Sequence, residues 1–121
     1  MAEYSFPKSN RLLTAADYKA VFDEATFKVS CRYFLILASR NNSTRSRLGL
    51  VIAKKNVAKA VQRNRVKRMI REYFRLHGEQ LRGLDLVVLA RKDVDTLQSG
   101  QLRERLGSLW RDLGAKVEKA C

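Results

Sequence analysis

The segment Arg47–Arg75, RLGLVIAKKNVAKAVQRNRVKRMIREYFR, joins two different sequence patterns. In its first part Leu48, Leu50 and Ile52 alternate with Gly, Val and Ala, which is typical of a strand. From Val57 onward the apolar residues follow helical spacing instead. They form one stripe at i, i+3, i+4, i+7 and i+8: Val66, Met69, Ile70, Tyr73 and Phe74. The segment therefore predicts a strand, with Lys54 and Lys55 at its end, followed directly by an amphipathic helix that packs its stripe on a sheet.

The opposite side of the predicted helix is basic. Asn64, Arg68, Arg71 and Arg75 lie at i, i+4, i+7 and i+11, and we call these four residues the basic ridge; Arg65 and Lys67 flank it. Like charges at such spacings cost a helix a few tenths of a kcal/mol per pair, and only Glu72 can offset this cost locally. A chain that keeps such a ridge is best explained if an anion neutralises it.

The whole chain is strongly basic for its 121 residues. It has 25 Lys and Arg against 12 Asp and Glu, a net charge of +13, and the stretch from Lys54 to Arg75 contributes nine basic residues and one acid. Nucleic acid is the commonest partner of such a concentrated charge. A solvated face that only improves solubility is the alternative. A membrane surface is less favoured, because no broad Trp- or Phe-rich face accompanies the charge.

The cysteines and the chain start indicate a cytoplasmic protein. Cys31 and Cys121 lie too far apart for a disulfide framework or a metal-binding spacing. The first residues lack the apolar stretch of a signal peptide, and no run approaches the length of a membrane span.

The remaining elements follow from the same rules. Thr14 and Asp17 predict a capped helix start, with Tyr18, Val21 and Phe22 on its apolar face. Short runs rich in β-branched and aromatic residues predict strands in FKVS (27–30), RYFLILAS (32–39) and LDLVVLARK (84–92). Gly78 or Gly83 ends the basic helix, and a final amphipathic helix carries Leu102, Leu106, Leu109, Trp110, Leu113 and Val117.

The predicted order is α-β-β-β-α-β-α, an α+β fold in which helices cover a four-stranded sheet. Residues 1–121 form a single domain in this interpretation, and residues 1–10 and 115–121 are expected to be frayed.

No catalytic constellation is evident. His77 is the only histidine and has no partner motif, and the nearest pair of acids, Asp93 and Asp95, lacks a third ligand nearby. Phosphate-binding glycine loops and HExxH are absent from the sequence. A protein-only nuclease that uses His77 with Asp93 or Asp95 remains an alternative.

The segment Arg47–Arg75 resembles the signature of the protein subunit of bacterial ribonuclease P. NRLLTAADYKAVF (10–22) and DLVVLARK (85–92) stand in the order that this family shows, and the resemblance covers about Ser5 to Leu113. It implies an α-β sandwich with a left-handed β-α-β crossover, against the general preference for right-handed connections. It also implies a non-catalytic protein that binds no cofactor, one copy per catalytic RNA. In the family, the RNA and its Mg²⁺ cleave the 5′ leader from precursor tRNA.

The resemblance assigns roles to particular residues. It implies RNA binding by the residues that match the basic motif: Lys54, Lys55, Arg63, Asn64, Arg65, Lys67, Arg68 and Arg71. It implies a leader-binding cleft with Tyr18, Phe22 and Phe34, whereas Leu37 stands where some members have another aromatic residue. Unpaired bases commonly stack on aromatic rings beside a cationic track. Core packing is the alternative for Tyr18 and Phe22.

A general RNA binder of the ribosomal or chaperone type, with no leader cleft, is the second alternative. If the arginines serve only RNA, replacing Arg65 or Arg68 by Ala should weaken RNA binding without a loss of fold stability.

Overall fold

The computed structural model describes residue 11 and residues 14–120. The elements follow the expected order: α1 (Ala15–Glu24), β1 (Phe27–Ser30), β2 (Phe34–Arg40), β3 (Arg47–Val51), α2 (Ala60–His77), β4 (Leu84–Ala90) and α3 (Ser99–Lys119). Two short 3-10 helices, η3 (Gly78–Leu81) and η4 (Val94–Thr96), precede β4 and α3. The α+β prediction is confirmed. None of the described helices is long and apolar enough to cross a membrane.

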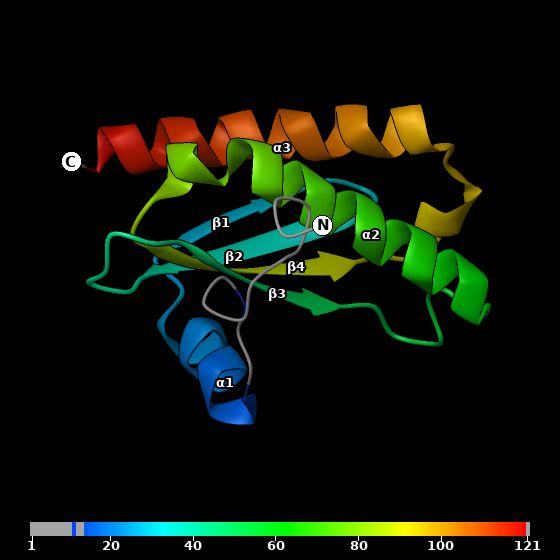
Figure 1. Ribbon diagram of the computed structural model, residues 1–121, viewed down its shortest axis with the longest axis horizontal. Helices are drawn as coiled ribbons and strands as arrows, with labels where there is room; N and C mark the ends of the chain where they lie inside the picture. Colours follow the sequence, from blue (N-terminus) through cyan, green and yellow to red (C-terminus); the bar gives the residue numbers. More distant parts are fainter. Residues whose placement is uncertain (1–10, 12–13, 121) are drawn as a thin grey trace, which may run out of the picture.

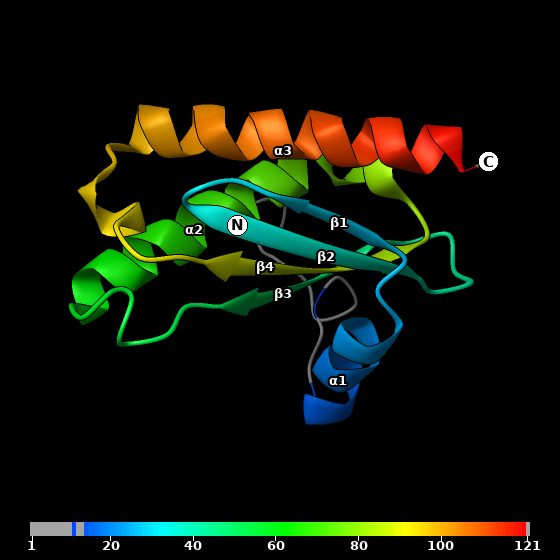
Figure 2. The ribbon, with the colours of Figure 1, turned by 180° about the vertical axis from the view of Figure 1, so that it is seen from behind.

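The four strands form one mixed sheet in the order β1-β2-β4-β3. β1 pairs with β2 and β2 with β4 in antiparallel fashion, whereas β3 pairs with β4 in parallel. Parallel neighbours need a crossover connection, and α2 supplies it. In Figure 1 α2 lies in front of the sheet, β3 and β4 both point to the right, and β4 lies above β3; Figure 2 shows the same arrangement from behind. If the picture is turned so that both strands point upward, β4 lies to the left of β3. The crossover is therefore left-handed, as the resemblance implied.

The helices lie on both faces of the sheet. α2 and α3 cover one face side by side, and α1 lies on the other (Figure 1). The main core fills the space between the sheet and the α2/α3 layer, and its largest fully buried side chains include Trp110, Phe34, Ile36 and Ile70. Trp110 packs edge-on against Tyr73 and Phe74, with ring centroids 5.4 and 6.1 Å apart, and so locks α3 to α2.

A smaller cluster holds α1 to the second face. Val21 of α1 and Val87 of β4 are fully buried there, with Tyr18, Leu37, Val51 and Leu89 packed around them. The helix start is the predicted capping box: Asp17 N–H donates to Thr14 Oγ1 at 3.1 Å, and Thr14 N–H donates to Asp17 Oδ2 at 3.2 Å. This cap sets where α1 begins, because it satisfies two backbone donors that the helix itself leaves unpaired.

Two glycines carry the chain from α2 to β4, and of the two alternatives predicted for the end of the helix the structure has Gly78. α2 ends at His77, and Gly78 begins η3. Gly83 has φ +76, which a side chain would strain, and a Cβ there would lie 3.1 Å from the Ser43 carbonyl oxygen. The turn into β4 therefore requires glycine.

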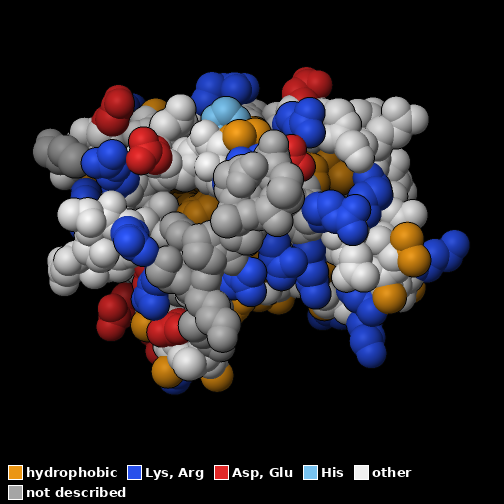
Figure 3. All heavy atoms as spheres, in the orientation of Figure 1, with side chains coloured by type: hydrophobic (Ala, Val, Ile, Leu, Met, Phe, Trp, Pro, Cys, Tyr) orange, Lys and Arg blue, Asp and Glu red, His pale blue; other side chains and the backbone are white. Residues whose placement is uncertain are grey.

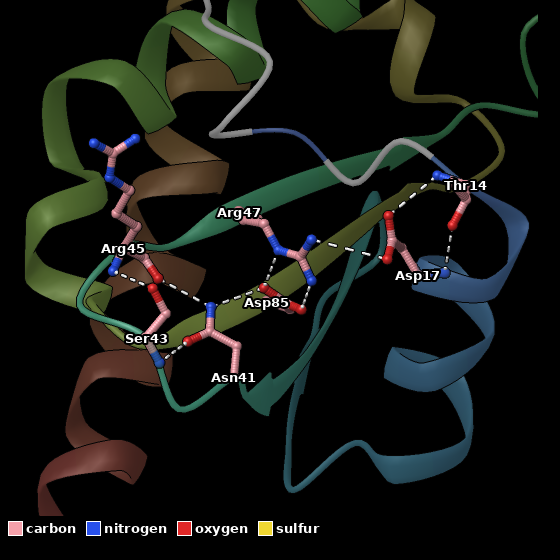
Figure 4. A network of polar contacts seen from close by, with 7 residues as sticks. All are labelled: Thr14, Asp17, Asn41, Ser43, Arg45, Arg47 and Asp85. Atoms are coloured by element: carbon pink, nitrogen blue, oxygen red, sulfur yellow. Dashed lines mark hydrogen bonds and ion pairs between the residues drawn. The ribbon is translucent and has the colours of Figure 1, made fainter.

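A polar network ties α1, β3, β4 and the β2–β3 loop together (Figure 4). Arg47 donates to both carboxylate oxygens of Asp85, at 2.9 and 2.6 Å, and lies 3.8 Å from Asp17. Asn41 donates to Asp85 Oδ1 at 2.8 Å and to the Arg45 carbonyl at 2.9 Å. The Asp85 side chain is only 9% exposed, so these donors replace the water that it loses. The sequence did not predict this network, because a single Asp in an apolar run, such as Asp85, does not indicate which residue it will pair with.

The Asp85 hydrogen bond is the main cause that raises the pKa of the Arg47 guanidinium above its ordinary value. A raised pKa means that the stabilisation is fully present below the ordinary arginine value and is lost only above it. Arg47 therefore keeps its charge, and its share of the stability, throughout the neutral range.

Three expected boundaries differ from those of the structure. β3 ends at Val51, so Lys54 and Lys55 lie on a turn after the strand, and α2 begins only at Ala60. Val57 is fully buried in the loop between them. α3 continues to Lys119, beyond residue 115, where fraying was expected. Val117 packs against the main core, which explains the longer helix.

We predict that Asp85→Asn lowers the free energy of unfolding by about 1–3 kcal/mol, because it leaves a partly buried Arg47 without its counter-charge. Urea denaturation measures this change. The control is Glu79→Gln, whose ion pair with Arg82 is 64–87% exposed and should matter by less than about 0.5 kcal/mol. Equal, small effects of both substitutions would contradict the structural role of the network.

Candidate nucleic-acid interface

α2 separates apolar and charged residues onto opposite sides, as its sequence predicts. Val66 and Ile70 are fully buried, Met69 and Phe74 are nearly so, and Tyr73 is half-buried at the contact with α3. Every residue of the basic ridge is exposed. Lys and Arg side chains gather over the part of the surface where the β3–α2 connection and the first half of α2 lie (Figure 3).

The loop before α2 holds Lys54 and Lys55 in place. Asn56 N–H and Val57 N–H both donate to the Ala53 carbonyl at 3.0 Å, which closes a tight turn around the two lysines. Asn56 Nδ2 also donates to the Ala90 carbonyl at 3.2 Å, so the turn is tied to the end of β4. Both lysine side chains remain exposed. Asn56 is thus a positioning residue that the sequence pattern did not reveal.

Arg63 also serves the loop. Its Nη1 donates to the carbonyls of Val57 and Ala58, at 3.0 and 2.8 Å. At least one side of the guanidinium is therefore used to fasten the loop to α2, which has no side-chain cap at Lys59.

Arg65 connects α2 to η4 and the start of α3. Its Nε donates to Gln62 Oε1 at 2.9 Å, and its Nη2 donates to the carbonyls of Leu97 at 2.9 Å and Asp95 at 3.4 Å. Arg65 therefore has a structural role, and its contact with RNA stays a prediction. A long-range bond of this kind cannot be read from helical spacing, because η4 lies about thirty residues away in the sequence.

Four cations of the interface have no partner in the described part of the chain. Among the described residues, neither Arg68, Arg71, Lys54 nor Lys55 forms an ion pair or a hydrogen bond. Their charges are thus free to meet an outside anion. No group of His, Cys, Asp and Glu in the described part of the chain could hold a metal ion.

Of the three aromatic residues proposed for a leader cleft, Tyr18 and Phe22 lie together on α1 and Phe34 lies elsewhere. Phe22 is 45% exposed on α1, and Tyr18 is half-buried one turn before it. Tyr18 Oη accepts the Leu50 N–H at 3.1 Å and thereby pairs a backbone group of β3, so Tyr18 has a structural role as well. Half-buried Leu37 lies on the same face of the sheet.

The structure contradicts the expectation that Phe34 lines the leader cleft. It has no exposed surface and belongs to the main core, on the face of the sheet that α2 and α3 cover. Successive strand residues point to opposite faces. Leu37, three positions along β2, therefore lies on the α1 face and Phe34 does not. Phe34 cannot contact a ligand on the α1 side.

His77 and the acids proposed for a nuclease are far apart. Arg65 bonds the Asp95 carbonyl, whereas His77 is the last residue of α2, twelve positions beyond Arg65. At 1.5 Å per residue this separation is about 18 Å. The His77 ring stacks on Tyr73, with centroids 4.2 Å apart, and its carbonyl accepts Trp110 Nε1–H. The contacts therefore place Asp95 near the first half of α2 and His77 at its far end, and they do not bring these two residues together.

The family model described as Ribonuclease P matches residues 6–114. The chain belongs to the ribonuclease P protein family. It is 50% identical over 113 residues to the "Ribonuclease P protein component" of Pseudomonas aeruginosa, covering 93% of this chain and 84% of that protein. The component from Chromohalobacter salexigens is 46% identical over 119 residues, covering 98% and 93%.

The folds of solved ribonuclease P proteins agree with this assignment. The Staphylococcus aureus protein superimposes with a TM-score of 0.79 at 28% identity, over 86% of this chain and 94% of that one. The Thermotoga maritima protein gives 0.72 at 34% identity, over 84% and 96%. The known function of the family is the 5′ processing of tRNA together with an RNA. A general RNA binder without a link to processing is thereby set aside.

We predict that Arg65→Ala lowers the free energy of unfolding by about 1–2 kcal/mol, because partly buried carbonyls of Asp95 and Leu97 lose their donor. Arg68→Ala, on the same helix, is the matched control and should change it by no more than about 0.5 kcal/mol. Thermal melts followed by circular dichroism compare the two. If both variants melt like the unaltered chain, the Arg65 bonds do not stabilise the fold.

Proposed function

We propose that this chain is the non-catalytic protein subunit of a ribonuclease P, and that its basic ridge, with Lys54 and Lys55, binds the catalytic RNA. The observation that carries the proposal is the exposed side of α2, where Arg68 and Arg71 have no counter-charge among the described residues, opposite a largely buried apolar stripe. Arg grips phosphate with two parallel hydrogen bonds, and Asn can reach sugar or base edges beside it. Arg63, Arg65 and Lys67 flank this surface, and the hydrogen bonds of Arg63 and Arg65 hold the neighbouring segments in place.

In this proposal the RNA, and not this chain, catalyses the cleavage of precursor tRNA. The His77 ring packs on Tyr73 and its carbonyl accepts Trp110 Nε1–H, and no described contact joins His77 to Asp93 or Asp95. Mg²⁺ would then be held by RNA phosphates rather than by this chain. Cations on the protein would lower the Mg²⁺ concentration that the RNA needs, since both screen the same phosphates. Such a subunit acts as one copy per RNA, in the cytoplasm of a bacterium.

The precursor leader would lie on the α1 side of the sheet. Phe22 offers an exposed ring there, Tyr18 lies one turn away, and Lys54 and Lys55 follow the end of β3. An aromatic face beside cations suits an unpaired strand. Leu37 offers no ring, so stacking would depend mainly on Phe22.

Reconstitution with a candidate catalytic RNA tests the assignment. At low Mg²⁺, cleavage of precursor tRNA should require added protein, and the protein alone should not cleave. Arg68→Ala/Arg71→Ala should weaken RNA binding roughly 20-fold near 0.15 M salt and reduce the slope of log affinity against log salt by about 1.5.

The control for the ridge variant is Arg103→Ala/Arg111→Ala, two exposed arginines on α3. It removes the same charge and should cost much less affinity. Cleavage by the protein alone, or binding that does not respond to salt, would overturn the proposal.

The leader site makes a separate prediction. Phe22→Ala should reduce the preference of the holoenzyme for precursor over mature tRNA by about 5- to 100-fold, the worth of one base–ring stack. Leu76→Ala is the control, since Leu76 is 59% exposed but lies on α2. Equilibrium binding of both tRNAs measures the preference. An unchanged ratio in the Phe22 variant would remove Phe22 from the leader site.

A further inference from the structure

A second set of basic side chains lies on the side of α3 that faces away from α2. Gly107 and Trp110 mark the side toward α2, because a Cβ at Gly107 would lie 3.0 Å from Tyr73 Oη and Trp110 packs on Tyr73. At 100° per residue, Arg105, Lys116 and Lys119 fall on the other side, above β1. Together with two residues of β1 and its turn they make a set that we call the α3 flank: Lys28, Arg32, Arg105, Lys116 and Lys119.

One half of the α3 flank borders a groove between β1 and α3. The groove has a volume of about 530 Å³, and Lys28, Val29 and Ser30 line it from the strand. Lys116, Lys119, Ala115 and Asp112 line it from the helix. Lys116 Nζ donates to the Lys28 carbonyl at 2.7 Å, which fixes one ammonium group at the rim. The groove is therefore basic, with a single carboxylate, Asp112, among its lining side chains.

The other half is arranged around Tyr33. The guanidinium carbons of Arg32 and Arg105 lie 5.4 and 5.9 Å from the centre of its ring. Within the described residues Arg105 has no carboxylate partner, and the ion pair of Arg32 with Asp93 is long, 3.6 Å, and well exposed. An aromatic ring orders a guanidinium without cancelling its charge. Both arginines are thus positioned and still available to an anion.

Protection of a sheet edge accounts for only part of this arrangement. β1 is an edge strand, and lysines such as Lys28 and Lys116 discourage pairing with another chain. This purpose does not require Arg105, which lies about three turns earlier on α3. An acidic peptide added to β1 would have to displace Lys116 from the Lys28 carbonyl. A phosphate backbone needs no such displacement, because it can bind the charges from outside.

We propose that the α3 flank is a second RNA-binding surface, which contacts phosphates of the catalytic RNA rather than the precursor leader. It rests on the proposed function, which supplies the RNA. Arg105 and Lys119 are fourteen residues apart, about 21 Å along the helix, a length that spans several phosphates. The leader site proposed above lies on the opposite face of the sheet, with α1 (Figure 2). The two RNA segments therefore meet different faces of the protein.

The test is Arg105→Ala/Lys119→Ala in the full chain, titrated with the candidate catalytic RNA over a range of salt. Both side chains are exposed, and Lys116 is left in place because it bonds Lys28. We expect binding roughly 10- to 20-fold weaker near 0.15 M salt and a salt slope reduced by about 1.5. The ratio of precursor to mature tRNA affinity in the holoenzyme should not change.

Arg103→Ala/Arg111→Ala is the matched control, with the same loss of charge from the same helix but on its other sides. Equal losses in the two double variants would show a non-specific charge effect and overturn the proposal, as would no loss or a loss confined to leader preference. A circular-dichroism melt of each variant establishes that it is folded. Arg68→Ala/Arg71→Ala belongs in the same titration: if it weakens binding while the flank variant does not, only the second surface fails, and if neither does, the proposed function fails.

Discussion

The burial of the apolar stripe of α2 is the constraint on which the rest of the structure depends. Since β3 and β4 are parallel neighbours, the chain must cross over the sheet between them, and α2 is that crossover. Val66, Ile70 and Phe74 each contribute about 1.5–3 kcal/mol by burial, which fixes the rotation of the helix about its axis. Once this rotation is set, the basic ridge can only point to solvent. The exposure of the basic ridge to solvent is thus a consequence of the packing of α2 on the sheet.

The arginines of α2 divide their work between the fold and the interface. Arg63 and Arg65 lie beside the stripe, and their guanidinium groups turn to backbone carbonyls of the preceding loop and of η4. Arg68 and Arg71 lie opposite the stripe, beyond the reach of those segments, and keep their charge for a partner. The basic helix is stable in the folded protein without a bound anion, because its tertiary contacts outweigh a like-charge repulsion of a few tenths of a kcal/mol per pair. Position on the helix, not residue type, therefore decides the role.

Local patterns predicted the local features of this fold and of its interface. The capping box of Thr14, the strand at 27–30 and the stripe of α2 depend on residues within one or two turns, so the sequence shows them directly. Phe34 was wrongly expected in the leader cleft. The alternation of side chains along a strand shows which residues share a face of the sheet, but it does not show which helices cover that face. The Arg47–Asp85 pair, the Asn56 turn and the Arg65 bonds join segments distant in sequence, and no local pattern encodes them. The RNA-binding roles themselves stay predictions.

The two basic surfaces stand at opposite edges of the sheet, and this separation affects how they act. β3, beside α2, and β1, beneath α3, are three strand spacings apart, about 14 Å. The Debye length is about 10 Å at 0.1 M salt, so exposed charges on one surface are largely screened from those on the other. Each surface would then release its own counter-ions, and their contributions to the salt dependence would add. A net charge of +13 concentrated on one edge would repel itself more strongly. Spreading it over two edges lowers this cost, and under the proposals above it would let one small protein hold two segments of the same RNA.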